Sequence, residues 1–226
     1  MAFYLPPGVD FFPHPFLADN DGLLAVGSEV SLNQILLAYQ YGIFPWSNSE
    51  DPLLWWFTHP RCVLYPSKIK VSKSMRSYLN GNRFEWSVDR DFAKVISLCR
   101  KIDRPGQGDT WITSEIHNIF LELHEMGFAH SVEVWNENEI VGGLYGLSIG
   151  KIFYGESMFS LQANASKFAL IKLCHFLKER EFDLIDCQQE TRHLMSLGAE
   201  LISAETFMDH LRLNIFKSGK NEDWTL

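Results

Sequence analysis

The sequence predicts an α+β protein in which a small N-terminal domain, residues 1–60, precedes a larger C-terminal domain, residues 61–226. Residues 130–159 form successive strand-like segments, and a helical segment and another short strand-like segment follow them, which favours a mixed sheet. The first 60 residues are instead rich in proline, aromatic and turn residues, which places a boundary near Pro60. Apolar residues make up 46% of the chain and charged residues 21%, the balance of a protein with a hydrophobic core.

One helix is expected in the N-terminal domain. Ser31 and Gln34 have the spacing of a capping box, in which each side chain bonds the backbone N–H of the other residue. Apolar residues follow at helical spacing, and Gly42 ends the helix. Two aromatic clusters, residues 43–46 and 54–56, flank the polar loop that comes next.

Periodicity places the elements of the C-terminal domain. Strands are predicted over residues 84–88, 130–135, 139–149, 151–159 and 183–188. Helices are predicted over residues 89–101, 113–127, 164–179 and 205–215. The polar tail from Ser218 is expected to fray.

Composition and missing motifs exclude several classes of protein. The formal net charge is −8, which argues against a protein that coats nucleic acid nonspecifically. No pair of the four cysteines has C-x-x-C spacing and no Cys/His pattern fits zinc, so we expect reduced thiols and no metal. No signal peptide and no long apolar stretch is present, so a cytoplasmic protein without a membrane segment is expected. G-x-x-x-x-G-K-[ST], G-x-G-x-x-G and H-E-x-x-H are also absent.

Asp186 and Gln188 are polar residues in an apolar, strand-like segment. Residues two apart on a strand point the same way, so both side chains would project from one face, with Ile185 and Cys187 on the other. A carboxylate and an amide side by side can hold a reacting amine. From the pattern alone, the stronger interpretation is an Asp that ends the strand and caps the next turn.

Glu156 lies within an apolar, strand-like segment. A buried carboxylate must be paired or well hydrogen-bonded. It either positions a substrate or anchors a neighbouring backbone, and the pattern does not separate the two.

A run of cations breaks the charge balance of the chain. Residues 52–84 contain no Asp or Glu, and several serines lie between the cations. Such a segment in an acidic chain indicates a phosphate-backbone site, and the alternative is a solvated loop. The cations are Arg61, Lys68, Lys70, Lys73, Arg76 and Arg83.

Ordered sequence blocks then indicate a family. They lie at residues 12–15 (FPHP), 21–27 (DGLLAVG), 41–46 (YGIFPW), 110–112 (TWI), 130–133 (HSVE), 141–146 (VGGLYG), 155–160 (GESMFS), 164–167 (NASK), 184–188 (LIDCQ) and 196–199 (SLGA). Through them the chain resembles the leucyl/phenylalanyl-tRNA–protein transferases from about Phe12 to Leu211. It departs from the family pattern at residues 57–59 (FTH), before Pro60, and at Leu144 and Leu177.

The resemblance implies a C-terminal domain similar to the acetyltransferase (GNAT) fold. It also implies transfer of Leu or Phe, with Met a further possibility, from aminoacyl-tRNA to proteins that begin with Arg or Lys. Such transfer marks the acceptor for the N-end rule pathway. No metal, acyl-CoA or other cofactor is implied, and we expect a monomer.

Site residues follow from the motifs and this reaction. Asp186, Gln188 and Glu156 are the predicted catalytic residues, with proton handling left open between Asp186 and Gln188. An apolar slot for the aminoacyl side chain is predicted, and Trp46 and Trp111 would stack on the terminal adenine. The predicted slot residues are Phe153, Ser157, Met158, Phe159, Leu173 and Leu177, for which plain core is the alternative.

Two other functions remain as alternatives. An acyl-CoA-dependent N-acetyltransferase would share the fold, but the pyrophosphate loop it needs is not found. A non-catalytic module that binds basic N-termini or tRNA could use the same polar residues.

Overall fold

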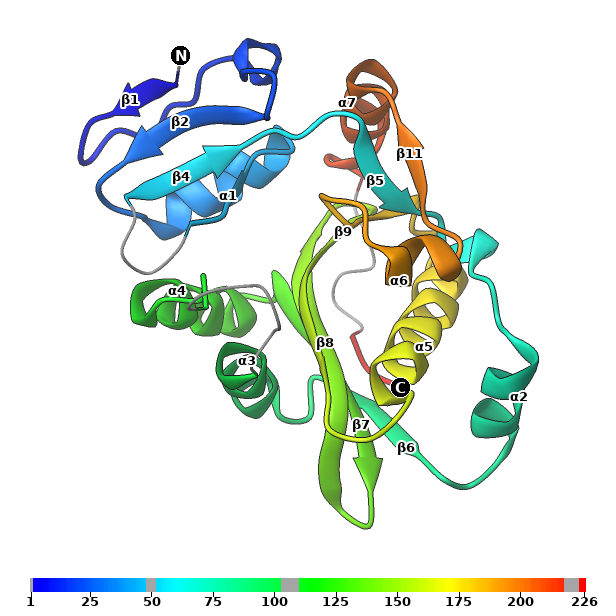
Figure 1. Cartoon of the computed structure of the whole chain (residues 1–226). Helices are drawn as coiled ribbons and strands as arrows, with labels where there is room; N and C mark the ends of the chain where they lie inside the picture. The colour runs from blue at the N-terminus through cyan, green and yellow to red at the C-terminus, as the bar shows by residue number, and fades with distance from the viewer. Residues whose placement is uncertain (1, 48–51, 103–109, 218–223) are drawn as a thin grey trace.

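The computed structural model describes residues 2–47, 52–102, 110–217 and 224–226, and these residues form two sheets (Figure 1). The smaller sheet has four strands in the order β1-β2-β4-β3, and the larger has seven in the order β11-β5-β10-β9-β8-β7-β6. In the larger sheet β10 runs parallel to β9, and the other neighbouring pairs are antiparallel. The predicted α+β class with a mixed sheet is therefore confirmed.

The smaller sheet is formed by the first 56 residues. Its strands are β1 (Phe3–Leu5), β2 (Leu23–Gly27), β3 (Phe44–Pro45) and β4 (Leu53–Trp56). A short 3₁₀ helix, η1 (Pro15–Leu17), precedes β2, and α1 (Leu32–Gln40) follows it. The capping box of Ser31 and Gln34 forms as predicted. The sequence did not predict the strands, because each is short and several flank prolines.

The remaining elements belong to the larger sheet and its cover. The strands are β5 (Arg61–Leu64), β6 (Glu85–Val88), β7 (Ala129–Asn136), β8 (Glu139–Ile149), β9 (Ile152–Ser160), β10 (Leu184–Asp186) and β11 (Glu200–Ile202). The helices are η2 (Pro66–Lys68), α2 (Lys73–Asn80), α3 (Phe92–Lys101), α4 (Ser114–Glu125), α5 (Ala165–Glu179), α6 (Arg192–Ser196) and α7 (Ala204–Asn214). No helix within the described residues is long and apolar enough to cross a membrane.

Helices cover both faces of the larger sheet. In Figure 1, α5 lies on one face of β7, β8 and β9, and α3 and α4 lie on the other. The start of α5 packs directly on β8, since a Cβ atom added to Gly142 would lie 2.5 Å from the Ala165 Cβ atom. A glycine in β8 is therefore what allows this helix to approach the sheet.

The two predicted domains share one hydrophobic cluster. Tyr39 of α1 and Tyr154 of β9 are both fully buried, and the Tyr154 hydroxyl donates a hydrogen bond of 2.7 Å to the Tyr39 carbonyl oxygen. Trp55 of β4 belongs to the same cluster. The domain boundary near Pro60 stays a prediction, but residues from the parts of the chain before and after Pro60 pack against one another.

The expectation of a frayed C-terminal tail is wrong for its last residues. Residues 218–223 lie outside the described part of the chain, but Trp224 is only 6% exposed. Its indole stacks on His130 of β7, with 3.8 Å between ring centroids and 3° between planes. An aromatic residue in the polar tail supplies the apolar surface that this docking requires.

Candidate functional site

A cavity of about 410 Å³ lies between the β3 end of the smaller sheet and the β9 and β10 strands of the larger one. The walls come from β3, β8, β9, β10, α5 and α6, so the cavity exists only when both parts of the chain are folded together. The predicted residues that line it are Trp46, Trp111, Phe153, Glu156, Ser157, Met158, Leu173 and Gln188.

Two predicted slot residues lie elsewhere. Phe159 is 2% exposed in the core and does not line the cavity. Leu177 is fully buried one turn beyond Leu173 on α5. Both residues belong to the hydrophobic core, which was the alternative interpretation of the sequence.

Several residues of the cavity were missed by the sequence interpretation. Leu170 of α5 lies three residues before Leu173, so helical spacing could have indicated it. Its neighbours across the cavity carry no such signal, because they come from separate elements. The other missed residues include Phe44, Ile185, Cys187, His193 and Leu194.

Asp186 and Gln188 do not share a strand face, so that prediction is wrong. The strand ends at Asp186, and Gln188 has a left-handed backbone with φ 54°. Ile185 and Cys187 line the cavity, whereas the Asp186 side chain is fully buried away from it. The Gln188 N–H donates 2.9 Å to the Asp186 carboxylate. Asp186 therefore ends the strand and caps the following turn, as the alternative held.

A buried ion pair satisfies the Asp186 carboxylate. Arg61 donates to it through Nε at 2.8 Å and through Nη2 at 2.6 Å. Nη2 also donates a hydrogen bond of 2.8 Å to the Gly42 carbonyl oxygen. The guanidinium group lies over the rings of Phe44 and Phe207. Arg61 is 1% exposed, so its predicted contact with tRNA is wrong: its charge neutralises a carboxylate instead.

Thr58 supports the same turn from a position where the chain departs from the family pattern. Its hydroxyl donates 3.0 Å to the Gln188 carbonyl and accepts from Arg61 Nη1 at 3.4 Å. The left-handed residue is thus held through its N–H and its carbonyl group, which leaves the Gln188 side chain facing the cavity.

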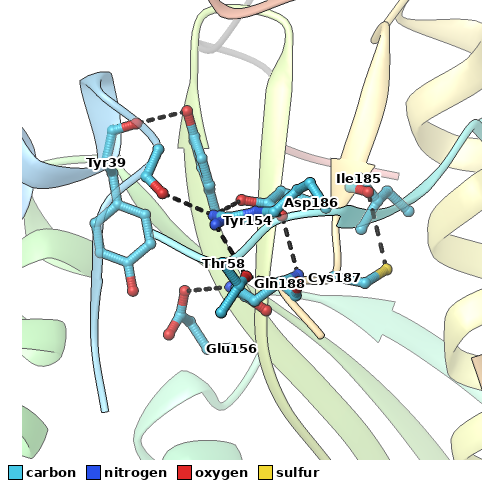
Figure 2. Close-up of polar contacts among 10 residues, drawn as sticks. Tyr39, Thr58, Tyr154, Glu156, Ile185, Asp186, Cys187 and Gln188 are labelled. Atoms are coloured by element: carbon cyan, nitrogen blue, oxygen red, sulfur yellow. Dashed lines mark hydrogen bonds and ion pairs between the residues drawn. The ribbon is translucent and has the colours of Figure 1, made fainter. Parts of the chain in front are cut away.

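Glu156 faces the Gln188 side chain inside the cavity. Gln188 Nε2 lies 3.5 Å from Glu156 Oε1. Figure 2 marks this contact with a dashed line between the two side chains. Burial raises the pKa of Glu156 to about 8, with a further increase from Asp186, while the Tyr39 hydroxyl and Arg61 act against the rise. No hydrogen bond of normal geometry joins Tyr39 to a described residue through its hydroxyl. Near neutral pH the Glu156 carboxyl is therefore largely protonated and close to its titration point.

His193 adds an unused polar atom to the cavity wall. Its Nε2 atom is buried and has no hydrogen-bond partner among the described residues. Burial, together with the charge of Lys167, lowers the pKa of His193, so the ring is neutral at neutral pH. A neutral imidazole nitrogen can accept from or donate to a substrate hydroxyl.

The other predicted cations are exposed around η2 and α2. Lys68 pairs with Glu200 at 2.9 Å, and the Arg83 guanidinium lies over the Tyr78 ring. Lys73 begins α2, and no acidic residue occupies the first turn. A cation at the positive end of the helix dipole leaves this end without an intramolecular anion.

Residues 146–150 read G-L-S-I-G and match the G-x-S-x-G pattern of serine hydrolases. In those enzymes the serine sits on a sharp strand-to-helix turn. Here Ser148 is fully buried inside β8, where it pairs with Phe153 of β9. The serine therefore lacks the exposure that a nucleophile needs.

Two family models match this chain. "Leucyl/phenylalanyl-tRNA protein transferase" matches residues 63–212, and "Leucyl/phenylalanyl-tRNA protein transferase N-terminal domain" matches residues 28–59. Similar curated proteins carry the name leucyl/phenylalanyl-tRNA–protein transferase. The one from Desulfotalea psychrophila is 46% identical and covers 95% of each chain. The one from Syntrophus aciditrophicus is 49% identical over 95% of this chain and 90% of that protein.

Solved structures are far less similar in sequence. A GCN5-related N-acetyltransferase from Kribbella flavida matches at 10% identity with a TM-score of 0.40, over 74% of this chain and 60% of that one. At this TM-score the match carries no argument. The α+β description therefore stands on the strand order itself.

Removal of Asp186 is expected to destabilise the fold. Asp186→Ala leaves the Arg61 charge buried without a partner, which costs about 3–5 kcal/mol. Arg61→Met leaves the carboxylate in the same state, so the double variant should lose less than the sum of the single losses. Chemical denaturation of the three variants measures this coupling.

The exposed pair Asp209–Arg212 provides the control for that cycle, since its side chains are 68% and 69% exposed. Alanine at either position should change stability little. Additive losses in the Arg61 and Asp186 cycle would contradict the ion pair.

Glu156→Gln is expected to change how stability depends on pH. The folded-state pKa is raised from 4.5 to about 8, so the folded state holds a proton that the unfolded state releases, and stability falls as pH rises through this window. Wild type should lose on the order of a few kcal/mol relative to the Gln variant between pH 4.5 and 8. Denaturant unfolding at several pH values measures the difference, with Glu179→Gln on the exposed end of α5 as control. A constant difference across this window would show that Glu156 titrates normally.

Proposed function

The chain belongs to the leucyl/phenylalanyl-tRNA–protein transferase family, and on that premise we propose that it moves Leu or Phe, with Met as a further donor, from an aminoacyl-tRNA to the α-amine of proteins that begin with Arg or Lys. Aminoacyl transfer from tRNA to protein is the activity of the family. The choice of donor and acceptor, and the residues that act, are the proposal.

The cavity is the observation that carries it. Its lining is mostly apolar, which suits a Leu or Phe side chain, and Gln188 and Glu156 add polar groups to the same cavity. A flexible methionine, Met158, suits a slot that accepts two different side chains. Trp46 and Trp111 also line the cavity, and the terminal adenine would stack on them.

The chemistry needs one bond made and one broken. The neutral α-amine nitrogen attacks the ester carbonyl carbon, the bond from that carbon to the ribose oxygen breaks, and one amine proton ends on that oxygen. An unperturbed α-amine has a pKa of about 7.7–8.0, close to the pKa of about 8 that burial gives Glu156. The ionised fraction of Glu156, which grows as pH rises towards 8, is suited to take the amine proton and return it.

Gln188 would position the incoming amine, and His193 would position the ribose end of the ester. Gln188 lies beside Glu156, so its amide can orient the incoming amine. The unpaired His193 Nε2 atom is available to a ribose hydroxyl. Asp186 acts through the Gln188 backbone as a positioning residue rather than by contact with the amine.

The exposed cations form the proposed tRNA surface. Lys70 lies between η2 and α2, and Lys73 and Arg76 lie on α2; all three are exposed, with Lys68 and Arg83 at either end. They would neutralise phosphates of the acceptor stem and read its shape rather than its sequence. The rest of an acidic surface favours a basic acceptor peptide. The product, a protein with Leu or Phe at its N-terminus, would enter the N-end rule pathway in the cytoplasm.

One assay separates this function from its alternatives. Labelled Leu-tRNA is incubated with peptides that begin with Arg, Lys or Ala, with and without ribonuclease. We expect label on the Arg and Lys peptides only, and its loss when the tRNA is digested first. Acetyl transfer from acetyl-CoA would favour the acetyltransferase, and tRNA binding without transfer would favour a recognition module.

Gln188→Ala is expected to lower the rate of transfer by roughly 100-fold, because the amine loses its orienting group. Single-turnover transfer from Leu-tRNA measures the effect. Gln162→Ala, outside the cavity, is the matched control and should transfer normally. A Gln188 variant with wild-type turnover would remove the amide from the mechanism.

Alanine at Lys70, Lys73 and Arg76 together should weaken aminoacyl-tRNA binding. Each lost phosphate contact reduces the slope of log K against log salt by roughly 0.7–0.9. Filter binding across a salt series measures both effects. Lys94→Ala/Lys101→Ala on α3, across the sheet, serves as the control, and equal slopes for all proteins would place the tRNA elsewhere.

A further inference from the structure

Trp224, two residues before the C-terminal Leu226, is enclosed by aromatic side chains of the larger domain. Besides its stack on His130, its ring centroid lies 5.1 Å from that of Phe176 and 5.7 Å from that of Phe153. In Figure 1 the C-terminus lies beside α5, in agreement with these contacts. The end of the chain therefore reaches the core behind β9.

Both the indole and the backbone around it are fixed. The His130 ring is held between Asp89 at 2.7 Å and the Gly127 carbonyl at 3.0 Å, which sets the plane on which Trp224 stacks. Arg180 Nη2 donates 2.9 Å to the Thr225 carbonyl. These anchors show that the position of Trp224 is specific.

Phe153 connects Trp224 to the cavity. Its side chain lines the cavity, and its ring packs against Gly146, where an added Cβ atom would lie 2.7 Å from the ring. Gly146 therefore lies close against the ring, and Trp224 packs against the ring as well. These two neighbours restrict the positions that the Phe153 ring can take.

We propose that Trp224 is a specificity-determining residue that sets the depth of the donor side-chain pocket by holding Phe153 in place. This inference rests on the proposed function, in which the apolar side chains that line the cavity receive the side chain of the transferred amino acid. Leu and Phe differ in length, so the position of one wall decides their relative rates. A difference of one methylene in an apolar pocket already changes rates by roughly 10-fold or more.

The test compares donors in variants of the full chain. Trp224→Ala removes the support, and we expect the ratio of kcat/KM for Phe-tRNA to that for Leu-tRNA to rise by roughly 10-fold. Trp224→Phe keeps an aromatic ring and should stay near the wild-type ratio. Leu226→Ala changes an exposed neighbour, 69% accessible, and is the matched control.

A second measurement separates this role from a general loss of packing. Added indole can occupy the space left by the tryptophan, as apolar cavities bind small aromatic molecules. It should return the donor ratio of Trp224→Ala towards the wild-type value. If Trp224→Ala does not fold, Trp224→Leu takes its place in both measurements.

The outcomes distinguish the two proposals. Equal losses with both donors in a folded variant, with no response to indole, would overturn the role of Trp224 and leave the proposed function intact. Absence of transfer by the wild-type chain with either donor would overturn the proposed function and this inference with it.

Discussion

The buried ion pair between Arg61 and Asp186 is the interaction on which the site depends. Two charges taken from water are costly, and here several hydrogen bonds and surrounding rings offset that cost. Arg61 bonds Gly42 from the first part of the chain and Asp186 from the last third. The same contact links Gly42 of the first part of the chain to β10 and holds the Gln188 turn, so it connects the two parts of the chain between which the cavity lies.

The pair also explains why burial dominates the chemistry of Glu156. Asp186 raises the pKa of Glu156, whereas the Tyr39 hydroxyl and Arg61 lower it. The loss of water around the carboxyl group is the largest cause, and the pKa is raised to about 8. A neutralised pair beside a desolvated acid is a simple way to obtain a group that titrates near the pKa of an α-amine.

The sequence predicted the long elements because periodicity is strong there, as in α5 and β8. It did not reveal the role of Arg61, because a cation in an acid-free stretch resembles a surface residue, and its partner lies 125 positions away. The sequence analysis correctly expected the Gln188 side chain at the site, but it did so by placing Gln188 on the same strand face as Asp186, which is wrong. A left-handed non-glycine residue turns it there, and the period of a strand cannot indicate such a residue.

Both ends of the chain contribute to the cavity, and this limits how the protein can be divided. The first part of the chain supplies Phe44 and Trp46. The Trp46 carbonyl oxygen accepts a hydrogen bond of 2.6 Å from the Trp56 indole. Near the other end of the chain, Trp224 packs against Phe153. Each of these walls is positioned by residues that do not touch the cavity. The shape of this pocket therefore depends on packing between distant parts of the chain. The local sequence around Gln188 and Glu156 determines only the positions of these two polar side chains.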